Sequence, residues 1–367
     1  MLRHSPSRAG LWATGLPIAM AIGMILVSGC AASSTPTLVP TFTPRLLPSP
    51  TPQPSPTAMP TASPTVAPET EVEAQPATYG LLIGGEAGFV PTGLTVDQDD
   101  NLYIVDALNH RILKYDSTGE LLSQWGSQGT QDGQFNFAQE GMPDTPLGDL
   151  AVDGYGNVYV VDYGNHRVQK FDKDGQFLTK WGTQGSAEGQ FDSPGFVGVN
   201  SQGEVFVSEL GNARVQKFDA NGTFLTQLQD PKAEGEWAIP TGIAIDGRDN
   251  VYVIVQGPNY ILMYSNSDDF IKQLDITQDA ILDPIYQPAG IAVDEQNNFI
   301  VADYHSGMVR KIDDRGQLVA QFPSSDAEYA QLVHPWDVSN DDLGNVYVTD
   351  PVQGVVLKIQ MESSSAP

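Results

Sequence analysis

Between residues 79 and 360 the chain repeats itself six times, with a period of about 47 residues. Each copy has an acidic or amide residue directly after a short apolar run, and this anchor aligns the copies. The anchors are Asp97, Asp153, Asn200, Asp246, Asp294 and Asp341, which are 56, 47, 46, 48 and 47 residues apart. A repeat of this length is one supersecondary unit that cannot bury its apolar face alone, so neighbouring copies must pack on one another.

Each copy predicts four antiparallel strands. Three residues after every anchor stands a residue that tolerates positive φ, as a tight hairpin turn requires. These residues are Asp100, Gly156, Gly203, Asp249, Asn297 and Gly344. The flanking runs, such as Asn157–Val161, are rich in β-branched and aromatic residues, and Asp-x-x-Gly turns such as Asp116–Gly119 follow the third strand. Helical periodicity of useful length is absent, so the fold class is all-β.

Six four-stranded units predict a six-bladed β-propeller, a ring that protects the strand edges. The sixth copy has its third strand at Val355–Ile359 but lacks a fourth. A segment before the first copy, Gly80–Gly85, resembles the fourth strand of that copy, Leu121–Gly126. We therefore expect the N-terminal strand to complete the last blade, with the propeller spanning residues 79–360 and a disordered tail at 361–367.

Three motifs of these copies resemble NHL repeats. They are G-Q-F at Gly133–Phe135 and Gly189–Phe191, P-x-G-[LI]-x-[VI]-D at the first strand, and D-x-x-N-H-R after the second. The resemblance covers about residues 79–360 and implies an NHL-type propeller. Propellers host many unrelated activities, so the fold alone does not give the function. Among NHL propellers, some animal proteins bind RNA through a basic face, and one lyase uses histidine-bound zinc.

The first 29 residues predict an export signal, because Arg3 and Arg8 precede an uncharged, largely apolar stretch. Val27–Cys30 resembles the lipobox of bacterial lipoproteins, in which the cysteine is lipidated and becomes the mature N-terminus. This resemblance implies lipidation of Cys30 and an extracytoplasmic protein that a lipid attaches to a membrane. The alternatives are a plain signal peptide or an uncleaved anchor.

Residues 30–78 predict a disordered tether behind the lipidated cysteine. Within residues 31–68 there are 11 prolines, and Arg45 is the only charged residue. Such a composition cannot bury enough apolar surface to offset the entropy of ordering.

The charge balance argues against a nucleic-acid partner. The chain has 18 Lys and Arg against 45 Asp and Glu, a net charge of −27. Binding to a phosphate backbone needs clustered cations, which this composition does not favour.

The loop between the second and third strands carries a predicted ion pair, an acidic residue followed five positions later by an arginine. The pairs are Asp106 with Arg111, Asp162 with Arg167, and Glu209 with Arg214. In the fourth copy both partners are lost together, as expected for a structural pair, since one partner alone would leave a buried charge. The fifth and sixth copies keep Asp303 and Asp350 but place Met308 and Val355 opposite them. We expect these two carboxylates to lack an internal partner, and to be either solvated or available to a ligand or cation.

The rim that holds these loops also holds the connections between blades, and we expect any functional site there. The first connection is the longest, and its extra residues are around Asn136–Thr145. Phe137 and Met142 stand there among polar residues, which predicts an exposed contact surface, although a variable surface insertion is the alternative. The candidate partner-binding residues are Phe137, Met142, Asp303, His305 and Asp350.

Catalytic and metal-binding motifs are not evident in the sequence. His110 and His166 occupy the N-H-R position of the repeat, which predicts a packing role. Zinc needs three or four converging ligands, and no short spacing supplies them. We therefore assign no catalytic residue, metal ligand or cofactor.

The first functional hypothesis is an extracytoplasmic, membrane-anchored, monomeric module that binds or scaffolds a protein, peptide or glycan. The alternative is a propeller-type lyase or lactonase that uses a divalent metal, near Asp303, His305 and Asp350 on the loop rim or in the central channel. A purely structural spacer is the third possibility.

Overall fold

The computed structural model describes residues 77–85, 87–138, 147–228, 230–231, 238–276, 285–322 and 332–361. The predicted export signal, Cys30, nearly all of the predicted tether, Met142 and residues 362–367 lie outside the described residues. In the described part, the helical structure is one turn of 3-10 helix at Tyr163–Asn165. No helix there has the length and apolar character needed to cross a membrane.

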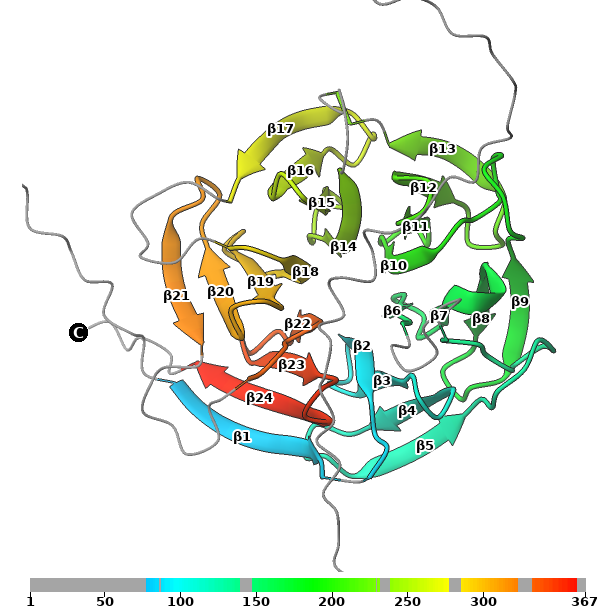
Figure 1. Ribbon diagram of the computed structural model, residues 1–367, viewed down its shortest axis with the longest axis horizontal. Coiled ribbons are helices and arrows are strands. Elements are labelled where there is room, and N and C mark those ends of the chain that lie inside the picture. Colours follow the sequence, from blue (N-terminus) through cyan, green and yellow to red (C-terminus); the bar gives the residue numbers. More distant parts are fainter. Residues whose placement is uncertain are drawn as a thin grey trace, which may run out of the picture. The chain divides into compact units, whose positions relative to one another are not determined.

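The described residues form a six-bladed β-propeller in which every blade is a four-stranded antiparallel sheet (Figure 1). Blade 1 consists of β2 (Pro91–Val96), β3 (Leu102–Asp106), β4 (Arg111–Tyr115) and β5 (Leu121–Trp125). Blade 2 consists of β6 (Leu150–Val152), β7 (Val158–Asp162), β8 (Arg167–Phe171) and β9 (Phe177–Trp181). Blade 3 consists of β10 (Pro194–Val199), β11 (Val205–Glu209), β12 (Arg214–Phe218) and β13 (Phe224–Leu228). Blade 4 consists of β14 (Ile239–Ile245), β15 (Val251–Gln256), β16 (Tyr260–Tyr264) and β17 (Phe270–Asp275). Blade 5 consists of β18 (Pro288–Val293), β19 (Phe299–Asp303), β20 (Met308–Ile312) and β21 (Leu318–Phe322). Blade 6 is β22 (Val338–Asn340), β23 (Val346–Asp350), β24 (Val355–Met361) and β1 (Ala77–Gly84).

The ring is closed by the N-terminal strand, as the sequence predicts. Strand β1 pairs antiparallel with β24, from Ala77 opposite Met361 to Gly84 opposite Val355. In Figure 1 the blue first strand and the red last strand lie side by side at the outer edge of blade 6. The first strand of each copy lies innermost, so β2, β6, β10, β14, β18 and β22 surround the axis (Figure 1).

Each hairpin between the first and second strands is held by its anchor residue. The Asp97 carboxylate accepts hydrogen bonds from the backbone N–H groups of Asp99 and Asn101, both at 2.9 Å. The hydroxyl of Tyr103, on the following strand, donates to the same carboxylate at 3.1 Å. Asp100 completes the turn at φ 61°. The repeated anchor is therefore a turn-capping group, which explains its spacing in the sequence.

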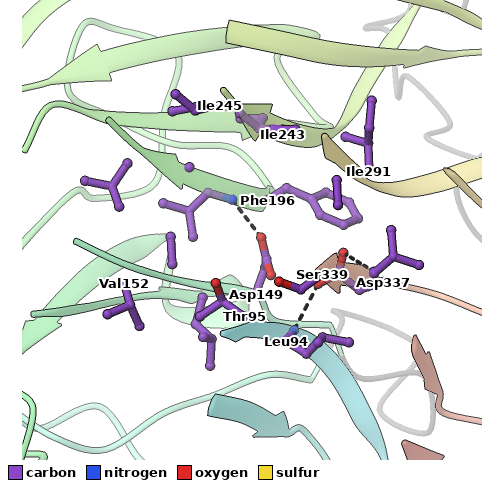
Figure 2. A pocket seen from close by; sticks show the side chains of 18 of the residues that line it. Leu94, Thr95, Asp149, Val152, Phe196, Ile243, Ile245, Ile291, Asp337 and Ser339 are labelled. Atoms are coloured by element: carbon purple, nitrogen blue, oxygen red, sulfur yellow. Dashed lines mark hydrogen bonds between the residues drawn. The ribbon is translucent and has the colours of Figure 1, made fainter. Parts of the chain in front are cut away.

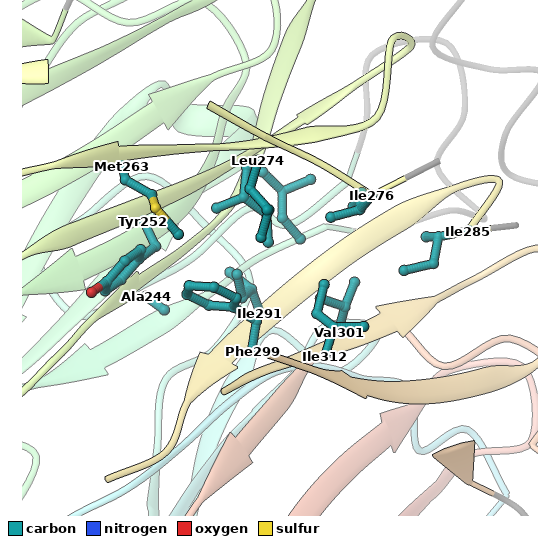
Figure 3. Packing of buried hydrophobic residues seen from close by; sticks show 12 residues of the cluster. Ala244, Tyr252, Met263, Leu274, Ile276, Ile285, Ile291, Phe299, Val301 and Ile312 are labelled. Carbon is teal, nitrogen blue, oxygen red and sulfur yellow. The ribbon is translucent and has the colours of Figure 1, made fainter. Parts of the chain in front are cut away.

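The apolar core lies between neighbouring blades. Figure 3 shows one such layer, in which Tyr252 and Met263 of blade 4 pack against Phe299 and Val301 of blade 5. All four side chains are at least 93% buried. Full burial of a side chain of this size contributes about 1.5–3 kcal/mol. Because each layer is built from two blades, every blade depends on its neighbours for stability.

Candidate functional site

The three predicted ion pairs form in blades 1 to 3. Nε of the arginine donates to the acidic side chain at 2.8 Å in Asp106–Arg111, 2.7 Å in Asp162–Arg167 and 2.5 Å in Glu209–Arg214. Each acidic group also accepts a backbone N–H from the connection before its blade, from Val90, Asn136 and Asp192 respectively. The buried carboxylate therefore fastens the connection to the loop, which is a structural role.

Asp303 has an internal partner, so the expectation that it lacks one is wrong. Nη1 of Arg310 donates to the Asp303 carboxylate at 2.6 Å, and both side chains are fully buried. Side chains alternate along a strand, so Arg310 faces the same side of β20 as Met308, the residue directly opposite Asp303. In this copy the arginine is seven residues after the acid instead of five, and its side chain still bonds to the carboxylate.

Asp350 is also buried, and backbone groups replace the arginine. Its carboxylate accepts the backbone N–H groups of Val333 at 2.6 Å, His334 at 3.1 Å and Gln353 at 3.0 Å. It is therefore neither solvated nor presented to a ligand. His305 is exposed, with its ring 5.7 Å from that of Tyr286. Among the described residues, no three His, Cys, Asp or Glu side chains converge as a metal-binding group, so Asp303, His305 and Asp350 do not form one.

Phe137 is fully buried, so the prediction that it is exposed is wrong. Its ring stacks on Phe135, with centroids 5.1 Å apart, and on His110, at 6.0 Å. The Phe137 backbone N–H also donates to Nδ1 of His110 at 3.2 Å. These contacts place Phe137 in the core between blades 1 and 2, and they give His110 the predicted packing role. His166 repeats that role by accepting the Ser193 N–H at 3.4 Å.

A cavity of about 240 Å³ lies on the axis of the ring, lined by the six innermost strands (Figure 2). Most of the lining side chains are apolar, Leu94, Val152, Ile243 and Ile291 among them, but the surface that the cavity exposes is mainly polar. The polar side chains on the wall are Thr95, Asp149, Asp337, Ser339 and Asn340.

The channel is closed at one end and accessible at the other. Near the blade connections, Phe196 of blade 3 stacks on Trp336 of the opposite blade 6, with centroids 6.0 Å apart, and both are buried. Near the hairpin turns, the lining residues Val152, Val293 and Asn340 are half-buried. A second hollow of about 570 Å³ lies among the turns of blades 4 to 6 and shares Val293 and Asn340 with the channel. The described channel therefore faces the hairpin-turn rim, whereas the sequence favoured the opposite rim.

Two carboxyl groups lie at the closed end of the channel. The first strands of the six copies have equivalent positions four residues before the anchors, occupied by Gly93, Asp149, Phe196, Gly242, Gly290 and Asp337. Asp149 and Asp337 belong to blades 2 and 6, which flank blade 1. A Cβ atom at Gly93 would lie 2.6 Å from Oδ1 of Asp149, so the glycine leaves the space that this carboxyl group occupies.

The carboxyl pair, Asp149 and Asp337, is buried and hydrogen-bonded. Oδ2 of Asp149 accepts the Val197 N–H at 2.8 Å, and Oδ2 of Asp337 accepts the Leu94 N–H at 2.9 Å. The two carboxyl groups are also close enough to influence each other's ionisation. Burial, and then the Asp337 charge, raise the pKa of Asp149 well above its usual value, while burial raises the pKa of Asp337 to about 7. At neutral pH the pair therefore retains a proton.

Sequence reasoning missed this pair although a signal was present. The P-x-G motif has glycine at this position in the first, fourth and fifth copies, and aspartate in the second and sixth. A charged side chain at the start of a buried strand is unusual enough to mark the position. Only the closed ring shows that copies two and six face each other across copy one.

The comparisons with known proteins agree with this geometry. The sequence pattern of the NHL repeat matches residues 90–115 and 148–171. The chain carries NHL repeats. Human NHL repeat-containing protein 3 is 34% identical over 103 residues, which are 27% of this chain and 27% of that protein. Rat peptidylglycine alpha-amidating monooxygenase is 34% identical over 115 residues, 29% of this chain and 11% of that protein. The NHL propeller thus matches only a minor part of each relative.

Solved structures with the same fold include enzymes. Virginiamycin B lyase from Staphylococcus aureus superposes with a TM-score of 0.55 at 13% identity, covering 78% of this chain and 99% of the lyase. A gluconolactonase from Xanthomonas campestris gives a TM-score of 0.56 at 15% identity, covering 78% and 89%. At these identities the likeness shows that the NHL propeller shares their fold.

Proposed function

We propose that this chain is an extracytoplasmic, lipid-anchored binding module whose NHL propeller recognises a protein, peptide or glycan at the central channel. The observation that carries the proposal is the closed-ended channel, in which polar groups converge between apolar side chains and make up most of the exposed surface. Polar groups placed in this way can fix the orientation of a ligand. The cavity of about 240 Å³ is smaller than the ~300–1,000 Å³ typical of sites for whole small molecules. It suits one side chain or sugar unit of a larger partner, whose remainder would lie along the turns of blades 4 to 6.

Blocking the channel tests this proposal. The full-length chain would be screened on peptide and glycan arrays, and each hit measured by calorimetry. The variant Ser339→Trp places a large ring in the channel, because Ser339 lines it and is half-buried. The control Leu178→Trp adds the same ring on β9, where Leu178 is 49% exposed. We expect at least a tenfold loss of affinity in Ser339→Trp alone. Equal affinity of both variants for every hit would reject the channel as the binding site.

Lipid anchoring is a separate part of the proposal, supported by Val27–Cys30 and by the composition of the tether. In a bacterial host fed an alkyne-tagged fatty acid, the protein should incorporate the tag and sediment with membranes. Cys30→Ala should lose both properties. A tagged Cys30→Ala protein would contradict lipidation at this residue.

Acid–base catalysis in the channel is the second candidate, and the carboxyl pair favours it. Two carboxyl groups that share a proton can supply an acid and a base to one substrate. The solved lyase and gluconolactonase have the same fold, which makes lactones and cyclic esters sensible first substrates. Turnover by the full-length chain that is lost in Asp149→Asn would support this candidate. Binding of the same substrates without turnover would reject catalysis and support the function as a binding module.

A further inference from the structure

We infer that the carboxyl pair makes the stability of the ring depend on pH, by fastening neighbouring blades while it shares a proton and weakening their junctions when both groups are ionised. This goes beyond the proposed binding function, since it concerns the protein without any ligand.

The pair lies at the junctions beside blade 1, where the first and last copies of the repeat meet. Asp337 precedes β22 of blade 6 and accepts the Leu94 N–H of blade 1. The same junction has a hydrogen bond from Oγ1 of Thr349 to the Thr92 carbonyl at 2.9 Å. On the other side of blade 1, Oγ1 of Thr92 donates to the Gly148 carbonyl at 2.8 Å. The inner strand of blade 1 is thus held from both sides, by Asp337 and Thr349 of blade 6 on one side and by Gly148, next to Asp149, on the other.

Asp149 repeats this arrangement one blade further on. Its carboxyl group accepts the Val197 N–H of blade 3, just as Asp337 accepts the Leu94 N–H of blade 1. At the inner strands of blades 5 and 6, the corresponding contact is between neutral backbone groups. There the Gly290 N–H donates to the Trp336 carbonyl at 2.9 Å. Asp337 and Asp149 therefore each link an inner strand to the neighbouring blade through an ionisable side chain, at the junctions of blades 6 and 1 and of blades 2 and 3.

The surroundings of the pair supply no opposing charge. The six innermost strands contain no titratable side chain, and neither Asp149 nor Asp337 has an ion pair among the described residues. The strands behind them, β7 and β23, carry the titratable residues Tyr159, Asp162, Tyr347 and Asp350. The two tyrosines bond to the turn anchors and the two carboxylates to the loops, away from the channel. Beyond Trp336 lie Tyr304 and His334, stacked on each other at 4.2 Å.

Ionising both carboxyl groups would consequently place two buried like charges together without a cation, which is strongly unfavourable. Burial, the largest cause for both groups, raises both pKa values, that of Asp337 to about 7. The folded protein therefore binds more protons than the unfolded chain at pH values between the usual aspartate range and about 7. Stability that is present at acidic pH is then lost as the pH rises through neutrality.

Thermal melting of the full-length protein between pH 5.5 and 9, at constant ionic strength and without ligand, tests the inference. The wild type should lose about 5 °C or more of melting temperature across this range. Asp149→Asn and Asp337→Asn should each reduce the loss, and the double variant should nearly abolish it. Asp153→Asn is the matched control, because Asp153 has the same chemistry, lies in blade 2 and is 8% exposed against 5% for Asp149. It should keep the wild-type pH dependence.

A double variant with the pH dependence of the wild type would overturn the inference. If a variant fails to fold, carbon NMR of aspartate side chains in the wild type gives the answer instead. At least one carboxyl resonance should titrate near neutral pH, and titration of all of them below about pH 5 would overturn the inference equally. Because no ligand takes part, this result is independent of whether the channel binds a partner.

Discussion

Blades 1 to 3 and blades 4 to 6 differ in the group that donates a hydrogen bond to the acidic residue near the loop between their second and third strands. In blades 1 to 3 a buried acidic group bonds to an arginine five residues later, at 2.5–2.8 Å. Blade 4 has no acid at this position, and the hydroxyl of Tyr260 donates instead to Asp230 at 2.5 Å. Blade 5 uses the displaced Arg310, and blade 6 uses backbone N–H groups around Asp350. In each blade the acidic group near this loop receives a hydrogen bond, and the residue that donates the bond differs from blade to blade.

Blade 6 differs most from the other blades, because its strands come from two segments that are distant in the sequence. Deleting residues 77–85 removes β1 and exposes the edge of β24, together with apolar surface beside Leu82 and Ile83. We expect the largest loss of stability here, about 5 kcal/mol or more. Urea unfolding followed by circular dichroism measures it. A synthetic peptide of residues 77–85 should restore part of the loss, and an unchanged midpoint after deletion would contradict closure by β1.

The connections of the two halves differ in how deeply their aromatic residues are buried. Phe137, before blade 2, is fully buried, whereas Tyr286, before blade 5, is 53% exposed. Phe137→Ala should destabilise the protein by about 3–5 kcal/mol, because it removes a packed ring. Tyr286→Ala should change stability by less than about 1 kcal/mol. Similar losses for both variants in chemical denaturation would show that burial does not distinguish the two connections.

The Asp303–Arg310 pair of blade 5 and the Asp106–Arg111 pair of blade 1 differ in solvent access. Arg310→Met leaves the Asp303 carboxylate buried without a cation and should cost about 3 kcal/mol. Arg111→Met should cost about 1 kcal/mol, because the Arg111 side chain is 30% exposed and water can approach. Replacing both residues, as Asp303→Leu with Arg310→Met, should recover part of the loss. A double variant less stable than Arg310→Met would argue against an uncompensated charge as the cause.

Blade 4 should give the smallest effect. Tyr260→Phe removes one hydroxyl that donates to Asp230 and should lower stability by about 1 kcal/mol. The matched variant Tyr252→Phe removes a hydroxyl that donates to the turn anchor Asp246 at 2.8 Å. Comparable losses are expected, since both bonds are partly buried. A loss above 3 kcal/mol for Tyr260→Phe alone would indicate that blade 4 depends on this bond as blade 5 depends on its ion pair.

The periodic features of this fold were predictable from the sequence, because turn chemistry and strand patterns are local. The anchors, the positive-φ turn residues and the missing fourth strand of copy six together define the closed ring. Departures from the repeat were harder to predict. Asp303 was assigned no partner because Arg310 is two positions from the expected slot, and only the strand geometry shows that both positions face the same side.

Phe137 and the carboxyl pair show two further limits. A phenylalanine among polar residues predicts an exposed side chain. In the structure, however, Phe137 fills a space between two blades that exists only in the packed ring. Asp149 and Asp337 are 188 residues apart in the sequence, and they meet because blades 2 and 6 both border blade 1. Contacts of this kind depend on ring closure and leave no local pattern.

The pairing of β1 with β24 also determines when the protein can finish folding. Each of blades 1 to 5 is one continuous stretch of chain, so all four of its strands are available as soon as that stretch has been synthesised. Blade 6 must wait until residue 361 is available, since its outermost strand comes from residues 77–84. Bringing segments so distant together is entropically costly and slow, so this last step is expected to set the pace of folding. Until then, the outer edge of β24 remains open to other chains.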